Sequence, residues 1–298
     1  MTSHEWGLLA ILSVLWGGAF FLIEIALRDL PPFSIMILRV GGAALFLWCI
    51  VVVRRSGMPK GWGMWLILTI MAVFNSALPF CLIAYGQTRI ESSLASILIA
   101  MTPLFAVITA HFFTDDEGFT PIKGFGVLSG IVGVTILIGP ESLMEIGDDL
   151  LAQLSVLGGA VSYSIAAVFG RRFGRKDMSP ISIAAGQVTM AAVLLLPFVL
   201  LFDHPWNLAL PSLAGWGAVA GLALLSTGLA YLIYYRVLAT AGATNLMLVN
   251  FLAPVSALIL GIFVLGESLT TEQFIGMAFI AFGLALIDGR IFARRRAD

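Results

Sequence analysis

The octapeptide LLAILSVL at residues 8–15 returns as LLAQLSVL at residues 150–157, with seven of the eight positions identical. The tripeptide Gly-Gly-Ala follows each copy, at residues 17–19 and 158–160. Self-similarity at a fixed spacing indicates an internal repeat, and a repeat constrains the architecture of the whole chain. The chain is therefore expected to consist of two similar halves.

The same correspondence reappears near the end of each half. Thr-Pro at 102–103 corresponds to Ala-Pro at 253–254, and EGFT at 117–120 corresponds to ESLT at 267–270. Two glycines, Gly126 and Gly133, correspond to Gly276 and Gly283. The spacing drifts only from 141 or 142 at the start to 150 or 151 at the end. We predict one repeat at residues 1–145 and a second at residues 146–298.

The composition places both halves in a lipid bilayer. Of the 298 residues, 60% are hydrophobic and 11% are charged, against roughly 45–50% and 25% in ordinary soluble domains. Apolar runs of about 20 residues, the length that crosses the hydrocarbon core, alternate with short polar breaks. The breaks predict ten transmembrane helices, at residues 6–27, 33–53, 62–85, 91–113, 120–138, 151–171, 180–202, 212–236, 243–265 and 272–292.

The apolar runs lack the period-two alternation of barrel strands, so they are predicted to be helices. Five crossings in each half turn the second half upside down relative to the first. The expected fold is an all-α integral membrane protein of ten transmembrane helices, built as two inverted five-helix repeats. This architecture is typical of secondary transporters, whose halves rock about a central site and so alternate access to the two sides of the membrane.

The distribution of lysine and arginine predicts the orientation. Basic residues concentrate in cytoplasmic segments, and with a cytoplasmic N-terminus thirteen of the sixteen lie on that side. We therefore expect a multi-pass protein of a bacterial inner membrane with both termini cytoplasmic. A topology with nine or eleven spans is the alternative. The net charge of −1 gives no indication of a nucleic-acid partner.

Uncharged polar and aromatic side chains recur at the middle of the predicted spans. Asn75 and Ser76 in the third span correspond through the repeat to Ser226 and Thr227 in the eighth. A symmetric polar pair at one depth predicts a shared cavity, in which hydroxyl and amide groups bind a zwitterion and rings stack on its apolar part. The alternative is that these groups only join helices to one another. The candidate substrate-binding residues are Trp16, Asn75, Ser76, Tyr163, Ser226, Thr227, Tyr231 and Asn250.

Two charged residues, Glu24 and Arg39, lie clearly inside the spans, and both are expected in the outer half of the membrane. Such charges are costly and usually functional. They predict an ion pair, which acts either as an outer gate or as a static clamp between helices. No charge is expected at mid-depth, which disfavours carriers of cationic drugs and of phosphorylated sugars. The predicted substrate is a neutral or zwitterionic small molecule.

Three prolines, Pro79, Pro103 and Pro254, fall inside predicted spans. A proline within a helix removes a backbone hydrogen bond and bends the helix. We predict that all three act as hinges, with a simple packing kink as the alternative, and the repeat relation between Pro103 and Pro254 favours a hinge role for that pair.

The glycines at residues 126, 130 and 133 form a small-residue face suited to close helix packing. A monomer is expected, and a dimer through this face is the alternative. The two cysteines and three histidines lack the spacing of a metal site. No metal and no cofactor are expected.

A set of short motifs extends over nearly the whole chain: Trp16-Gly17-Gly18, Pro31-Pro32, Arg39, Pro103, Pro254, Gly266-Glu267, Gly276 and Gly283. In this order they resemble the ten-helix EamA-type members of the drug/metabolite transporter superfamily. The resemblance implies export of amino acids or related metabolites through a cavity framed by the first, third, fourth, sixth, eighth and ninth helices. Within that family the sequence is most similar to exporters of aromatic and other neutral amino acids. Glu24 is a departure, because the family often has a basic residue there.

The predicted function is a secondary transporter that exports aromatic or neutral amino acids, or related metabolites, across the inner membrane by alternating access. A multidrug or other metabolite exporter is the alternative. A channel fits two inverted halves with central prolines less well. An intramembrane enzyme would need a catalytic or metal constellation at depth, and the sequence indicates none.

Overall fold

The structure is a computed structural model that describes residues 2–113, 120–139, 147–173, 179–246 and 248–288. The predicted boundary between the repeats, at residues 145 and 146, and the predicted cytoplasmic C-terminus lie outside the described residues. Eight helical spans are long and apolar enough to cross a bilayer, and two shorter apolar helices, Val249–Leu265 and Thr271–Ile287, complete the set. The expected ten-helix membrane fold is thereby confirmed.

The first half supplies five spans, several of which are composite. Their elements are α1 (Ser3–Ala26), α2 (Pro32–Val53), α3 (Trp62–Ala72) with η1 (Val73–Ala77) and α4 (Leu78–Gly86), α5 (Ser92–Ile99) with α6 (Thr102–Phe113), and α7 (Pro121–Ile138).

The second half follows the same plan. Its elements are α9 (Asp148–Phe173), α10 (Pro180–Phe198) with η2 (Val199–Asp203), the short η3 (Pro205–Asn207), α11 (Leu213–Ala220) with η4 (Gly221–Leu229) and α12 (Ala230–Ala241), α13 (Ala243–Leu246), α14 (Val249–Leu260) with η5 (Gly261–Leu265), and α15 (Thr271–Asp288).

Local sequence explains where several helices begin. The side chain of Thr120 accepts a hydrogen bond from the backbone N–H of Lys123, and that of Ser179 accepts one from Ser182. A proline follows each cap at the first helical position, where its missing N–H costs nothing. These start signals are readable in the sequence, which is why the predicted boundaries agree closely with those observed.

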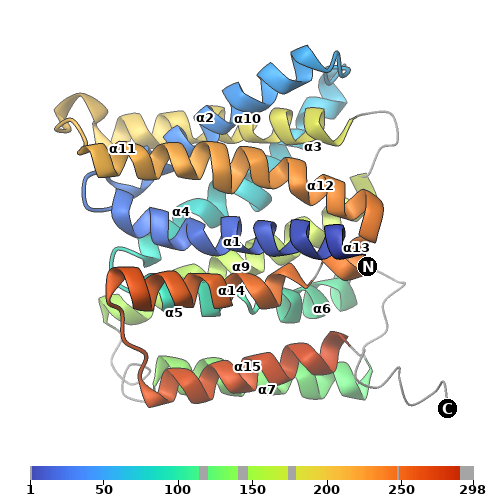
Figure 1. The fold of residues 1–298 in the computed structure, drawn as a ribbon, viewed down its shortest axis with the longest axis vertical. Coiled ribbons are helices and arrows are strands. Elements are labelled where there is room, and N and C mark those ends of the chain that lie inside the picture. The colour runs from blue at the N-terminus through green and yellow to red at the C-terminus, as the bar shows by residue number, and fades with distance from the viewer. Residues whose placement is uncertain (1, 114–119, 140–146, 174–178, 247, 289–298) are drawn as a thin grey trace.

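The fifth and tenth spans, α7 and α15, pack side by side as a pair (Figure 1). A Cβ atom added at Gly133 would lie 2.6 Å from the carbonyl oxygen of Gly276, and one added at Gly126 would lie 2.8 Å from that of Gly283. Residue numbers rise along one helix as they fall along the other, so the helices are antiparallel. Because they are equivalent spans, the second half is inverted. The glycine face considered for a dimer therefore packs within the chain.

The remaining contacts obey the same two-fold relation. Helix α1 packs against α14, as the equivalent α9 packs against α6. Helix α1 also packs against α12, as α9 packs against α4. The central pair, α2 and α10, are equivalent spans in mutual contact. In Figure 1, α1 begins and α15 ends on the same side of the bundle, as an even number of crossings requires.

The third and eighth spans share a departure from α-helical geometry at their centres. Residues Val73–Ala77 and Gly221–Leu229 are π-helical. Such insertions are rare and often mark functional sites. Both repeat-related polar pairs, at 75–76 and 226–227, lie in these segments, so the polar positions are combined with an irregular backbone in each half.

Candidate functional site

A hydrogen bond joins each half of the protein to the π-helical segment of the other half. The Nε of Arg39 on α2 donates to Oγ1 of Thr227 on η4 at 3.0 Å. The Nε2 of Gln187 on α10 donates to Oγ of Ser76 on η1 at 2.9 Å and to the hydroxyl oxygen of Tyr231 on α12 at 3.1 Å. The bonds Arg39–Thr227 and Gln187–Ser76 link the two halves, whereas the bond Gln187–Tyr231 lies within the second half. We call these five residues the central network.

The central network has internal symmetry. The segment PFSIMILR at residues 32–39 aligns with PISIAAGQ at residues 180–187, at a spacing of 148. Arg39 and Gln187 are thus equivalent positions, and so are their acceptors Thr227 and Ser76. The two bonds are copies of one interaction across the repeat, with arginine in one copy and glutamine in the other.

Arg39 places a positive charge deep in the protein. Its side chain is 6% exposed, and its guanidinium carbon lies 3.8 Å from the centre of the Phe80 ring. A cation over an aromatic face is stabilised by the ring quadrupole, all the more when both are removed from water. The described residues give Arg39 no carboxylate within ion-pair distance, since their salt bridge joins Arg89 to Asp148. The guanidinium can therefore offer its remaining donors to an anionic group.

A row of aromatic rings leads away from the network. The Tyr231 and Tyr235 rings stack with centroids 6.3 Å apart, and Tyr234 meets Tyr235 edge-on at 5.1 Å. Trp16 on α1 then contacts Tyr234 at 5.7 Å. Tyr163 on α9 lies close enough to Arg39 for an electrostatic interaction. These rings combine apolar faces with hydroxyl groups, a lining suited to a ligand with both polar and apolar parts.

The structure brings together some of the predicted substrate-binding residues. Ser76, Thr227 and Tyr231 belong to the central network, Tyr163 lies beside it, and Trp16 reaches it through Tyr234 and Tyr235. Of the other three, Asn75 and Ser226 are chain neighbours of network residues on the π segments, and Asn250 lies partly buried on α14.

The predicted ion pair between Glu24 and Arg39 is not formed in the described structure. Arg39 is held by Thr227 and Phe80, whereas Glu24 lies in an end pocket beside Arg28. The expectation of an uncharged mid-depth was also wrong. Thr227 is the central residue of the 29-residue span Leu213–Ala241, and Arg39 bonds to it. Counting helical rise locates a Cα atom and misses the reach of a long side chain.

The predicted hinge prolines lie in different settings. Pro103 is the second residue of α6, directly after the break at residues 100–101, and Pro79 is the second residue of α4, after the π segment η1. Pro254 is inside α14, where the helix continues through it. Two of the three thus accompany interruptions of their spans, and their action as hinges stays a prediction.

Three carboxylates tie the two halves together at one end of the bundle. Asp203 accepts from the backbone N–H of Ser34 at 2.6 Å and from its hydroxyl at 2.8 Å. Asp29 accepts from the backbone N–H of Ser212 at 2.9 Å and from its hydroxyl. Acids at helix starts are favoured by unpaired N–H groups and the helix dipole. We call this end, defined by Asp29, Asp203 and Glu267, the carboxylate end.

Glu267 makes the third of these links. Its oxygens accept from the backbone N–H groups of Ser92 and Ser93 at 2.9 and 3.0 Å, and from both hydroxyls. Gly266, with φ of +75°, turns the chain after η5 so that Glu267 points back at α5. A side chain on Gly261 would collide with the Glu267 carboxylate. The glycines around this turn thus leave room for the Glu267 carboxylate to bind α5 at the carboxylate end.

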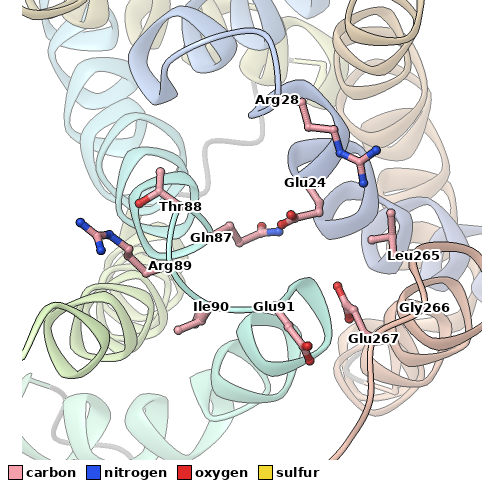
Figure 2. A pocket seen from close by; sticks show the side chains of 10 residues that line it. All are labelled: Glu24, Arg28, Gln87, Thr88, Arg89, Ile90, Glu91, Leu265, Gly266 and Glu267. Carbon is pink, nitrogen blue, oxygen red and sulfur yellow. The ribbon is translucent and has the colours of Figure 1, made fainter.

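A pocket of about 340 Å³ opens beside Glu267 (Figure 2). Its walls come from the end of α1, the turn between α4 and α5, and the turn after η5. Desolvation, reinforced by the charge of Glu267, raises the pKa of Glu91 on this wall. The lining residues are Glu24, Arg28, Gln87, Thr88, Arg89, Ile90, Glu91, Leu265, Gly266 and Glu267.

Comparison with known proteins assigns the chain to a family. The model of the EamA-like transporter family matches twice, over residues 5–139 and 150–288. The chain belongs to the EamA-like transporter family. The two matches correspond to the two halves, and the protein is accordingly a multi-pass membrane transporter of this family.

Similar EamA-like proteins cover the chain almost completely. The uncharacterized transporter YoaV of Bacillus subtilis is 27% identical over 293 residues, covering 97% of this chain and 98% of its own. The uncharacterized inner membrane transporter YedA of Escherichia coli is 27% identical over 294 residues, covering 94% and 89%. A solved crystal structure shares the fold, with a TM-score of 0.68 and 20% identity over 100% of both chains.

Several residues of the site were missed in the sequence. Gln187, Tyr234 and Tyr235 were not candidates, and Arg39 was expected at the outer side rather than in the centre. A signal for Gln187 exists, because the alignment of residues 32–39 with 180–187 pairs it with Arg39. The ring contacts depend on how the spans rotate about their axes, which the sequence alone does not specify.

Proposed function

We propose that this EamA-like transporter exports neutral amino acids, above all aromatic ones, or closely related zwitterionic metabolites. The central network is the proposed substrate site. Arg39 binds the carboxylate, the Tyr231 and Thr227 hydroxyls bind neighbouring polar groups, and the row of tyrosines with Trp16 receives the apolar side chain.

The observation that carries this proposal is the buried guanidinium of Arg39 without a carboxylate partner among the described residues. Arginine presents a planar fork of donors that matches a carboxylate. A buried charge without a counter-charge is costly, so an anionic substrate group stabilises the site when it binds. The positive charge also disfavours cationic drugs, which would meet it at mid-depth.

Alternating access follows from where the network lies. Its hydrogen bonds run between α2 and η4 and between α10 and η1, which belong to opposite halves. Rocking of the halves would part the three carboxylate links at the carboxylate end and expose the network to that side. Closing them again, with separation at the other end, would release the substrate there.

The charge distribution supports placing the carboxylate end outside the cell. The position equivalent to Asp203 at the spacing of 148 is Arg55. The loop after the seventh span therefore carries an acid at the carboxylate end, and the equivalent loop after the second span carries a base at the opposite end. Basic residues favour the cytoplasmic side. In this orientation the N-terminus is cytoplasmic.

Proteoliposomes test the proposal directly. We expect saturable counterflow of labelled phenylalanine, tryptophan or leucine, measured with and without pH and Na⁺ gradients. Absence of exchange for every amino acid in the panel would contradict the proposed substrate class. Non-saturable flux would contradict a carrier and favour a channel.

A further inference from the structure

The pocket at the carboxylate end contains two buried oxygen atoms without a hydrogen-bond partner, Oε2 of Glu24 and Oε1 of Gln87. Gln87 is only 4% exposed, and its Nε2 donates to the carbonyl oxygen of Phe20 at 2.9 Å. That bond prevents the amide from turning over, because a carbonyl needs the NH₂ group facing it. The Gln87 oxygen is therefore held as an acceptor. A buried acceptor without a donor is costly.

The pocket contains more carboxylates than unpaired basic side chains that could neutralise them. Arg89 is already paired with Asp148 at 3.0 Å, which leaves Arg28. Glu267 is satisfied by Ser92 and Ser93, so Glu24 and Glu91 share Arg28, which forms no salt bridge with either in the described structure. Figure 2 shows Gln87 and Glu24 reaching toward one another across the pocket. The pocket carboxylates are Glu24, Glu91 and Glu267.

We propose that this pocket binds a small monovalent cation, a proton or Na⁺, at Glu24 together with Gln87. Either cation neutralises the carboxylate and relieves the unpartnered oxygens: a proton converts Glu24 into a donor, and Na⁺ takes both side-chain oxygens as ligands. The site is separate from the central network and binds no part of the proposed substrate.

The cation site has no copy in the other half. At the spacing of 141 found from Gly17 onward in the first span, the position equivalent to Glu24 is Ile165. The pocket walls come from both halves, because Glu24 and Gln87 belong to the first and Glu267 to the second. A cation bound there stabilises the carboxylate end in its closed form. Cation binding thus makes the two sides of the otherwise two-fold-symmetric carrier different.

Thermal unfolding of the purified protein tests the site without any substrate, so its failure is distinguishable from failure of the amino-acid proposal. At constant ionic strength, NaCl is exchanged for choline chloride and pH is varied. A ligand that binds only the folded state raises the unfolding midpoint. If Na⁺ binds, it raises the wild-type midpoint by several degrees, and Glu24→Gln abolishes the rise. If a proton binds, Na⁺ has no effect and acidification stabilises the wild type relative to Glu24→Gln.

Glu24→Lys provides a second variant, since its ammonium supplies the missing charge from within. We expect it to fold, to be insensitive to Na⁺ and to lose the acid-dependent gain. Asp149→Asn, an exposed position outside the pocket, is the matched control and should follow the wild type. If Glu24→Gln does not fold, the responses of Glu24→Lys and Gln87→Met to Na⁺ and pH test the proposal instead. Equal responses of the wild type and the pocket variants to both Na⁺ and pH would overturn the proposal.

Discussion

Arg39 and Gln187 occupy equivalent positions in the two halves and donate equivalent hydrogen bonds, to Thr227 at 3.0 Å and to Ser76 at 2.9 Å. The backbone of the network is therefore two-fold symmetric while its charge is not. A symmetric scaffold serves alternating access, because both halves can reach the same contacts. In the proposed substrate site, the single guanidinium would bind one end of the substrate.

Replacing Arg39 with glutamine makes the two copies alike and removes the charge. We expect counterflow of carboxylate-bearing substrates to fall by at least about tenfold, which corresponds to about 1.4 kcal/mol. Arg39→Lys should restore little, because lysine lacks the planar fork and packs differently over Phe80. Unfolding should change little, since the variant also loses the cost of burying a charge. Arg236→Gln, at an exposed arginine of α12, is the control and should transport normally. Wild-type transport by Arg39→Gln would remove Arg39 from the site.

Gln187 and Ser76 should be coupled energetically. Each of Gln187→Leu and Ser76→Ala leaves a buried partner without its bond, at a cost of about 1–3 kcal/mol. The double variant should cost less than the sum of the single variants, with a coupling of about 0.5–3 kcal/mol. Denaturant unfolding of the four proteins in detergent measures the difference. Strict additivity would show that the hydrogen bond between Gln187 and Ser76 does not persist in solution.

The sequence predicted the fold because its evidence is repeated and local. Apolar runs and the polar breaks between them located the spans, and five crossings in each half of the repeat predicted the inversion. Part of the site was predictable for the same reason, since Ser76 and Thr227 are related by the repeat. The position of Arg39 was not, because depth along one helix does not specify which neighbouring span its side chain reaches.

Glycine substitutions inside and outside the contact between α7 and α15 should have opposite effects on stability. The Cβ of Gly133→Ala would approach the Gly276 carbonyl oxygen to 2.6 Å, and overpacking of this kind typically costs about 1–3 kcal/mol. Gly217 on α11 has nothing within 4 Å of its added Cβ. Gly217→Ala should therefore stabilise by about 0.5–1 kcal/mol through helix propensity. Thermal unfolding in detergent compares them, and equal effects at both sites would contradict the described packing.

The pH dependence of stability should include a contribution from Glu91. Its raised pKa means that the folded protein favours the protonated carboxyl more than the unfolded chain does. The stability contributed by that proton is present below the ordinary glutamate pKa of about 4.3, and it is lost as pH rises through the folded-state pKa. Glu91→Gln should therefore be more stable than the wild type at neutral pH and should converge with it in acid. Asp149→Asn controls for removal of an exposed carboxylate, and a pH-independent difference for Glu91→Gln would contradict the assignment.

Recognition of a substrate carboxylate by Arg39 is the central claim. Its most direct test is competition of labelled phenylalanine counterflow in proteoliposomes by unlabelled phenylalanine and by phenylalaninamide, which keeps the ring and the amine but lacks the carboxylate. We predict that phenylalanine competes and that phenylalaninamide does so at least about tenfold more weakly, since a charge-assisted hydrogen bond contributes about 1.5–3 kcal/mol. Equal competition by the two compounds, or no phenylalanine exchange at all, would contradict the account.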